Sequence, residues 1–141
     1  MHDPSPRPDF ARPSGARIYD YLNGGKDNFA PDREAADAIE AMFPGMSGLV
    51  RQHREFARRA ARWLHDEGVH QFLDVGCGLP SRPMVAEAVA GARVAYVASD
   101  PVVLAHLRAL AAGPGIAVVA GDEADPEAVL AAPELAEVID L

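Results

Sequence analysis

The chain has 141 residues, of which 49% are hydrophobic and 24% are charged, a composition typical of one globular domain and not of a disordered segment. Its formal net charge of −8 at pH 7 repels nucleic-acid phosphates, and it contains no apolar run long enough to cross a membrane. The N-terminus lacks the apolar core of a secretory signal, and the single cysteine, Cys77, has no partner for an internal disulfide. We therefore expect a cytoplasmic protein without nucleic-acid or membrane partners.

The N-terminal part begins with a segment rich in proline, residues 1–16, which predicts an extended arm. It is followed by "IYDYLNGGKDNF" at residues 18–29, where a glycine pair precedes the chain's only lysine, as in a phosphate-binding loop. That loop also needs a glycine five residues before its Gly-Lys pair and Ser or Thr after the lysine, but Asp20 and Asp27 stand there. The glycines therefore predict a sharp turn instead.

Two helices are predicted after this turn. The first starts near Asp32, with Pro31 at an early position, and stops at the Pro-Gly pair at 44–45. The second spans about 48–67, because apolar residues recur there at helical spacing up to a closing glycine. These apolar residues are Leu49, Phe56, Ala60, Trp63 and Leu64.

Four arginines share one face of the second helix: Arg51, Arg54, Arg58 and Arg62. We interpret this row as a solvated face that also carries Glu55. A nucleic-acid patch would need basic charge elsewhere too, and the sequence shows none.

Beyond residue 70 the hydrophobic pattern changes to short apolar runs. "QFLDVG" at 71–76, "RVAYVAS" at 93–99 and "IAVVAG" at 116–121 each suit a strand buried on both faces. Helical stretches follow them at about 82–90, 101–112 and 126–132. This alternation predicts an α/β fold with a parallel sheet and right-handed crossovers. Three strands leave unpaired edges, so we expect that the chain is truncated or that something else completes the sheet.

The loop after the first strand, "FLDVGCGLP" at 72–80, carries the pattern Asp74-x-Gly76-x-Gly78. Glycines there let the backbone turn tightly and approach a ligand, and the next helix can direct N–H groups at an anion. A dinucleotide fingerprint would need a third glycine where Ser81 stands. Asp74 could bind an ammonium group by a charge-assisted hydrogen bond, or it could merely cap the turn. Cys77 in this loop is either a reactive thiol or a small side chain that fits a crowded place.

"LDVGCG" resembles the first motif of the class I S-adenosylmethionine-dependent methyltransferases. In that class the loop wraps the methionine part of the cofactor, with the acidic residue near its amino group. Further acidic residues follow the second and third strands and bind the ribose and the adenine amino group. Here "YVASDP" and "VVAGD" supply Asp100 and Asp122 at those places. All three would lie at the carboxyl edge of the sheet, where open parallel sheets bind ligands.

Three segments together are similar to one actinobacterial S-adenosyl methyltransferase family, formerly a domain of unknown function: "RPSGARIYDYLNGGKDNFAPDREAAD", "FLDVGCGLPSR" and "YVASDPVVLAHLRAL". The resemblance implies a Rossmann-like parallel sheet, truncated to about three strands. It divides the chain into an arm (1–16), an N-terminal helical lid (17–68) and a partial cofactor-binding domain (69–141). It implies S-adenosyl-L-methionine as cofactor, an unknown methyl acceptor and no metal; no catalytic residue is assigned. The cofactor-binding residues that it implies are Asp74, Gly76, Gly78, Asp100 and Asp122. To these we add Tyr21 and Asn28, because the N-terminal segment that contains them is interpreted as a lid over the cofactor.

The sequence departs from this family at several points. Ala98 replaces the first of two aspartates after the second strand, so that Asp100 either contacts the ribose or caps the helix that begins at Pro101. After the third strand, Asp122 and Asp125 are kept but Ala124 replaces an arginine. Family members also run to roughly twice this length.

Three functions remain open at this stage. The first is a methyltransferase or its cofactor-binding half, and the second is a truncated or degenerate, non-catalytic remnant that binds the cofactor. The third, a dinucleotide-binding oxidoreductase, is disfavoured by Ser81. In the lid, Tyr19, Tyr21, Lys26 and Asn28 are candidates to close over the cofactor or acceptor. Alternatively, they form a structural turn in which a tyrosine packs and Lys26 pairs with a carboxylate.

Overall fold

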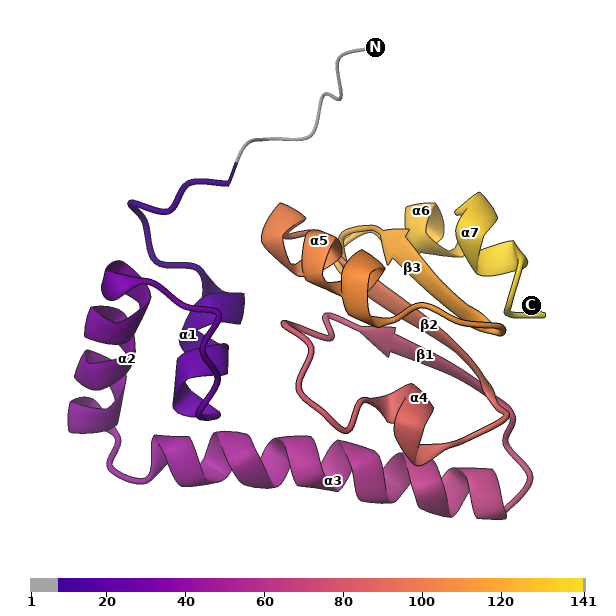
Figure 1. Ribbon diagram of the computed structural model, residues 1–141, viewed down its shortest axis with the longest axis horizontal. Helices are drawn as coiled ribbons and strands as arrows, with labels where there is room; N and C mark the ends of the chain where they lie inside the picture. Colours follow the sequence, from indigo (N-terminus) through magenta and orange to yellow (C-terminus); the bar gives the residue numbers. More distant parts are fainter. Residues whose placement is uncertain (1–7, 141) are drawn as a thin grey trace, which may run out of the picture.

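The computed structural model describes residues 8–140, in which three N-terminal helices precede a small α/β unit (Figure 1). Helix α1 (Gly15–Leu22) is followed by α2 (Ala30–Met42) and the long α3 (Met46–Asp66). Gly24, with a φ of 84°, provides the predicted turn after α1, and Pro31 lies in the first turn of α2 as expected. Of the predicted arm, residues 1–7 lie outside the described residues.

The sheet has three parallel strands in the order β1 (Gln71–Val75), β2 (Arg93–Ala98) and β3 (Ile116–Ala120). This confirms the predicted α/β fold with a parallel sheet. The register aligns Asp74 of β1 with Tyr96 of β2, so the carboxyl ends of the strands meet at one edge. The polar ends of the strands are thereby gathered on the side that faces the N-terminal helices.

Helices cover the two faces of the sheet. On one face lie α4 (Val85–Ala88) and α5 (Pro101–Leu110), and on the other α6 (Pro126–Leu130) and α7 (Pro133–Ala136). Helix α4 is a single turn and not the predicted helix over 82–90. Pro83, which lacks a backbone N–H, precedes its first turn, so the chain between 79 and 84 stays irregular.

Only part of the sheet is enclosed. Strand β2 is buried along nearly its whole length, as predicted. The same prediction is wrong for β1, where Leu73 is 38% exposed and Val75 is 44% exposed. The reason is positional: β1 is an edge strand, and α6 and α7 pack only over β2 and β3 on that face.

Helix α3 runs beneath α1, α4 and the edge of the sheet (Figure 1). The helical period predicted its existence correctly, but Phe56 and Trp63 are 61% and 63% exposed. The buried face instead carries Val50, Arg58 and Ala61. None of the helices within residues 8–140 is long and apolar enough to span a membrane.

Candidate functional site

A cavity of about 620 Å³ opens at the carboxyl edge of the sheet, between the strand ends, α1 and α3. Its volume falls within the range of small-molecule sites in proteins. The ionisable or polar side chains that line it are Ser14, Tyr19, His53, Arg54, Arg58, Asp74, Cys77, Ser81, Tyr96, Ser99, Asp100, Asp122 and Glu123. Five of the seven predicted cofactor-binding residues lie here: Asp74, Gly76, Gly78, Asp100 and Asp122.

The glycine loop follows β1 and forms one wall of the cavity. Gly76 and Gly78 have φ values of 65° and 67°, a region that favours glycine. A Cβ on Gly76 would lie 2.3 Å from a carboxylate oxygen of Glu123, and one on Gly78 would lie 3.1 Å from Nη2 of Arg54. The positive φ values favour glycine at both positions, and at Gly78 the Arg54 side chain also leaves little space for a Cβ.

Helix α3 holds the end of this loop with two arginines. Nη2 of Arg54 donates to the carbonyl of Leu79 at 3.0 Å. Arg58 donates through Nε to the carbonyl of Pro83 at 2.6 Å and through Nη2 to that of Ser81 at 2.9 Å. The interpretation of the whole arginine row as a solvated face is thus wrong for these two.

Sequence reasoning missed this role, although a signal was present. Val50, Arg54, Arg58 and Ala61 follow one another at spacings of four, four and three residues, which places them on one helical face. Small or aliphatic residues at both ends of that row mark a face that can lie close to a neighbour. Arg51 and Arg62 lie off it and are exposed, as predicted.

Asp74 faces the cavity from the end of β1. No hydrogen bond from any residue between 8 and 140 reaches its carboxylate, so capping of the turn is not its role. Burial raises the pKa of Asp74 above its ordinary value, an effect that the charges of Arg54 and His53 partly offset. The cavity thus holds a carboxylate that is partly desolvated and without a hydrogen-bond donor.

Cys77 is buried beside this carboxylate. Burial first, and the charge of Asp74 second, raise the pKa of its thiol to about 12. A thiolate is therefore disfavoured at neutral pH, and the interpretation as a small packing side chain holds over that of a reactive thiol.

Both carboxylate oxygens of Asp100 accept hydrogen bonds from nearby protein groups. Oδ1 accepts from the backbone N–H groups of Val102 at 2.8 Å and Val103 at 3.4 Å, which confirms the predicted helix cap. Oδ2 accepts from the hydroxyl of Ser14 at 2.9 Å. Ala98, at the end of β2, offers the cavity only a methyl group.

Asp122, beyond β3, lines the far side of the cavity. Its Oδ1 accepts from the backbone N–H of Ala124 at 2.9 Å, a local turn that fixes the orientation of the side chain. The adjacent Glu123 lies over Gly76. The third strand thus contributes two carboxylates to the cavity.

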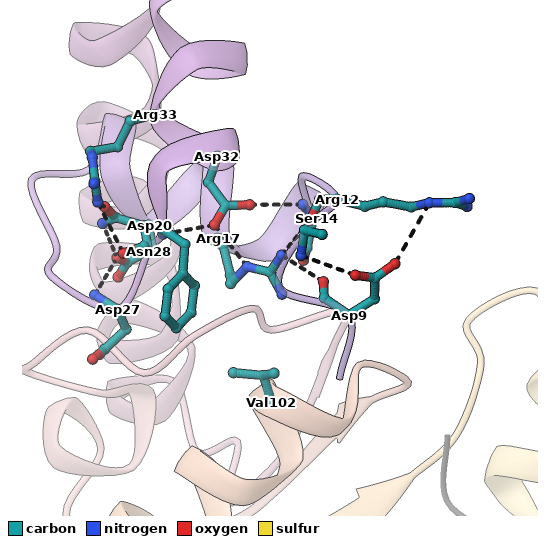
Figure 2. A network of polar contacts seen from close by, with 12 residues as sticks. Asp9, Arg12, Ser14, Arg17, Asp20, Asp27, Asn28, Asp32, Arg33 and Val102 are labelled. Atoms are coloured by element: carbon teal, nitrogen blue, oxygen red, sulfur yellow. Dashed lines mark hydrogen bonds and ion pairs between the residues drawn. The ribbon is translucent and has the colours of Figure 1, made fainter. Parts of the chain in front are cut away.

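Of the other two predicted residues, Tyr21 lies in the last turn of α1, and Asn28 lies in the turn between α1 and α2 (Figure 2). Asn28 donates to Asp20 at 2.9 Å and to the carbonyl of Gly25 at 3.1 Å, and it is not among the residues that line the cavity. Tyr21 packs against the small apolar cluster that contains Leu22. The structure therefore does not bring these two side chains to the other five.

A buried ion pair ties α1 to α2 in the same region. Asp32 accepts from Nε of Arg17 and from the backbone N–H groups of Ser14 and Phe29, at distances of 2.8, 2.9 and 2.8 Å (Figure 2). Burial alone would raise the pKa of Asp32, but these donors lower it below its ordinary value. Within residues 8–140, Lys26 forms no ion pair, so the alternative in which it pairs with a carboxylate is wrong.

Of the four N-terminal candidates Tyr19, Tyr21, Lys26 and Asn28, Tyr19 is the one that lines the cavity. The guanidinium of Arg54 lies over its ring at 5.0 Å from the centroid, and its hydroxyl lies 2.7 Å from Nδ1 of His53. No group of three or more His, Cys, Asp or Glu residues suited to a metal ion occurs among the described residues.

Comparison with known proteins connects this cavity with a family. The model of the S-adenosyl methyltransferase family matches residues 1–141. Among solved structures, a protein from Thermobifida fusca YX, provisionally named a methyltransferase, is 43% identical over 97% of this chain, with a TM-score of 0.90. A DUF574 family protein from Streptomyces avermitilis MA-4680 is 40% identical over 94% of this chain, with a TM-score of 0.89.

The chain spans about half of these two structures, 54% of each. Among curated proteins, no relative matches it. The family match extends over the whole sequence, and the two solved structures reproduce its fold at substantial sequence identity. The chain therefore belongs to the S-adenosyl methyltransferase family.

Proposed function

We propose that this chain is an S-adenosylmethionine-dependent methyltransferase or its cofactor-binding half. The observation that carries the proposal is the partly desolvated Asp74 carboxylate, which faces the cavity beside two glycines whose positive φ values favour a backbone without side chains. The family match supports the same cofactor. In this proposal residues 17–68 form the lid and residues 69–141 form the partial cofactor-binding domain. Helices α1 and α3 of the lid contribute to the cavity wall.

The residues present fit the cofactor at three places. Asp74, which lacks a hydrogen-bond donor of its own, would accept from the ammonium of the methionine part. The loop at Gly76 and Gly78 would lie against that part of the cofactor, because a closely approaching ligand needs a backbone without side chains. Asp122 would meet the adenine amino group, and Asp100 would reach the ribose only beside its present role as a helix cap. For Tyr21 and Asn28, only the interpretation of residues 17–68 as a lid supports a cofactor role.

S-adenosylmethionine supplies an already activated methyl group, so the protein mainly has to position two reactants and exclude water. Here the apolar wall of the cavity, which includes Met84, Val103 and Leu107, provides a dry surface, while the carboxylates fix the orientation of the cofactor. The methyl acceptor is not specified by any group that we identify in the cavity.

A second candidate is a degenerate module that binds the cofactor without catalysing transfer. The observation in its favour is Ala98, a methyl group at the position where the family carries an aspartate, combined with the engagement of both Asp100 oxygens. An oxidoreductase that binds a dinucleotide fits less well, because Asp74 would repel a pyrophosphate at the glycine loop.

Isothermal titration calorimetry with S-adenosylmethionine, S-adenosylhomocysteine and NAD separates these functions. We expect both sulfur-containing ligands to bind and NAD not to bind. If the folded protein binds none of the three, the proposed cofactor-binding function is wrong. If it binds S-adenosylhomocysteine but transfers no methyl group to any acceptor offered, the non-catalytic candidate gains support.

A second experiment places a carboxylate at position 98, where the family carries an aspartate, and measures its effect on cofactor affinity. We expect Ala98→Asp to tighten S-adenosylhomocysteine binding by about 1–3 kcal/mol, the range of a hydrogen bond to a charged group. Calorimetry on the variant measures the change, with Ala105→Asp as a control on the exposed side of α5. An unchanged or weaker affinity would show that Asp100 or another group already fills the ribose role, or that this site does not exist.

A further inference from the structure

Two oppositely charged side chains line the cavity without forming an ion pair with each other. Asp74 projects from β1 and Arg54 from α3, and both are lining residues. The ion pairs of the described residues do not include this pair, so the two groups lie beyond 4.0 Å of each other. They are nevertheless close enough for the charge of Arg54 to act on the Asp74 carboxyl group. Each charge is left for a third group to satisfy.

Arg54 is held in place by contacts that use only one of its nitrogens. Nη2 donates to the carbonyl of Leu79, and the guanidinium plane lies over the ring of Tyr19. Among residues 8–140, Nε is buried and has no hydrogen-bond partner, whereas Nη1 is also unpaired but is not buried. Polar groups of a largely enclosed side chain are nearly always paired in native proteins, so a guanidinium with two unpaired nitrogens beside a cavity points to a ligand, which would bind at the accessible Nη1.

The fixed position of Arg54 depends on the glycine loop as well. A Cβ on Gly78 would lie 3.1 Å from Nη2, so the arginine fills the space that the glycine leaves. A stacked, anchored guanidinium loses little conformational entropy when it binds a further partner. The geometry is that of a preorganised anion-binding group and not of a flexible surface arginine.

The chemistry of the ligand follows from the two charges together. A phosphate would satisfy Arg54 but would be repelled by Asp74, and a simple amine would satisfy only Asp74. A group that carries an ammonium and a carboxylate on one carbon satisfies both. We infer that Arg54 binds the α-carboxylate of the amino acid part of the cofactor while Asp74 binds its α-ammonium.

This inference rests on the proposed function and assigns to Arg54 a role in cofactor specificity. An arginine on α3, outside the glycine loop, makes the site distinguish an intact amino acid group from an adenosine derivative that lacks the carboxylate. The lid is thereby a part of the binding site itself, since Arg54 reaches the cavity from α3 and stacks on Tyr19 of α1.

Calorimetry with S-adenosylmethionine and decarboxylated S-adenosylmethionine tests the inference. We expect the wild-type protein to bind the intact cofactor about 10- to 100-fold more tightly than the decarboxylated one, the range of a charged hydrogen bond. In Arg54→Met this preference should disappear, because affinity for the intact cofactor falls while affinity for the decarboxylated cofactor stays the same. Arg62→Met, an exposed arginine of the same helix, should retain the wild-type preference.

Each other outcome has a defined meaning. If Arg54→Met weakens both ligands equally, Arg54 acts only by holding the loop at Leu79, and the inference is overturned. If the wild-type protein binds both ligands equally, the inference is overturned. This wild-type comparison does not depend on whether Arg54→Met folds. If Arg54→Met keeps the wild-type preference, the carboxylate is bound elsewhere and the proposed function survives alone. If the folded wild-type protein binds neither ligand, the proposed function fails, and this inference fails with it.

Discussion

Helix α3 has charged residues on its inner face and large apolar residues on its outer face, which is the reverse of a usual surface helix. The face turned toward the cavity and the glycine loop bears Arg54 and Arg58, and Arg58 is almost fully buried. The face turned to solvent bears Leu49, Phe56 and Trp63. In most helices of globular proteins the apolar stripe faces the core and the charged residues face water.

This inversion has a physical reason on the inner face. The segment 79–83 after the glycine loop has few regular hydrogen bonds of its own, so its carbonyl groups need donors. Guanidinium groups supply several donors each, and three carbonyls of this segment accept from Arg54 or Arg58. The polar face is thus a scaffold for the loop that lines the cavity, whereas the aromatic face has no partner among residues 8–140.

The largest effect should come from removing an arginine of the inner face. We expect Arg58→Met to lower the free energy of unfolding by about 2–4 kcal/mol, because it leaves the carbonyls of Ser81 and Pro83 without their donors. Urea denaturation measures the change. Arg62→Met, at an exposed position of the same helix, should stay within about 0.5 kcal/mol of the wild type.

Equal stability of the two arginine variants would contradict the comparison, since it would mean that the hydrogen bonds of Arg58 contribute nothing net. A selective loss in Arg58→Met, with unchanged unfolding of Arg62→Met, would show that the inner face stabilises the fold as well as shaping the cavity.

The same helix shows how far sequence reasoning reaches. Period 3.6 in the apolar residues was sufficient to predict α3 within two residues at its start, because local spacing decides whether a helix forms. It did not predict which face is buried, because burial depends on what packs against the helix from distant parts of the chain. The loop carbonyls at 79–83 that attract Arg54 and Arg58 are more than 20 residues away in sequence.

The residues of the candidate site also fall into two groups, those that the sequence could predict and those that it could not. Asp74, Gly76, Gly78, Asp100 and Asp122 were predictable, because each lies at or just after the end of a strand, and parallel strands end at one edge. The roles of Tyr19 and Arg54 were not predictable in this way, since both reach the cavity from helices outside the sheet. Asn28 looked like a ligand-binding residue from its motif, yet its amide donates within the turn beside Asp20.

An intermediate effect on the free energy of unfolding is expected from Asp74, which lines the cavity together with Arg54 of the inner face of α3. Burial raises its pKa above the ordinary value of 3.8, so the folded state binds this proton more tightly than the unfolded state. The resulting stabilisation is complete below pH 3.8 and is lost as the pH rises through the raised folded-state pKa. Ionised Asp74 therefore lowers stability at neutral pH.

Asp74→Asn removes that unfavourable charge. We expect it to raise the free energy of unfolding at pH 7 by no more than about 1 kcal/mol, and the difference from the wild type should shrink as the pH falls toward 4. Thermal or urea unfolding over this pH range measures it, with Asp37→Asn on the exposed side of α2 as the control. A loss of stability at pH 7 would show that Asp74 has a favourable partner in solution.

The smallest effect is expected on the outer face. Phe56→Gln and Trp63→Gln should each change the free energy of unfolding by no more than about 0.5 kcal/mol, because these rings are 61% and 63% exposed and have little buried area to lose. Val50→Ala, on the buried face, should instead cost about 2 kcal/mol. Urea denaturation of the three variants compares the faces directly. If the glutamine variants lose as much as Val50→Ala, the aromatic rings are packed in solution. Gel filtration at two protein concentrations then tells whether a second copy of the chain covers them, since only that contact would weaken on dilution.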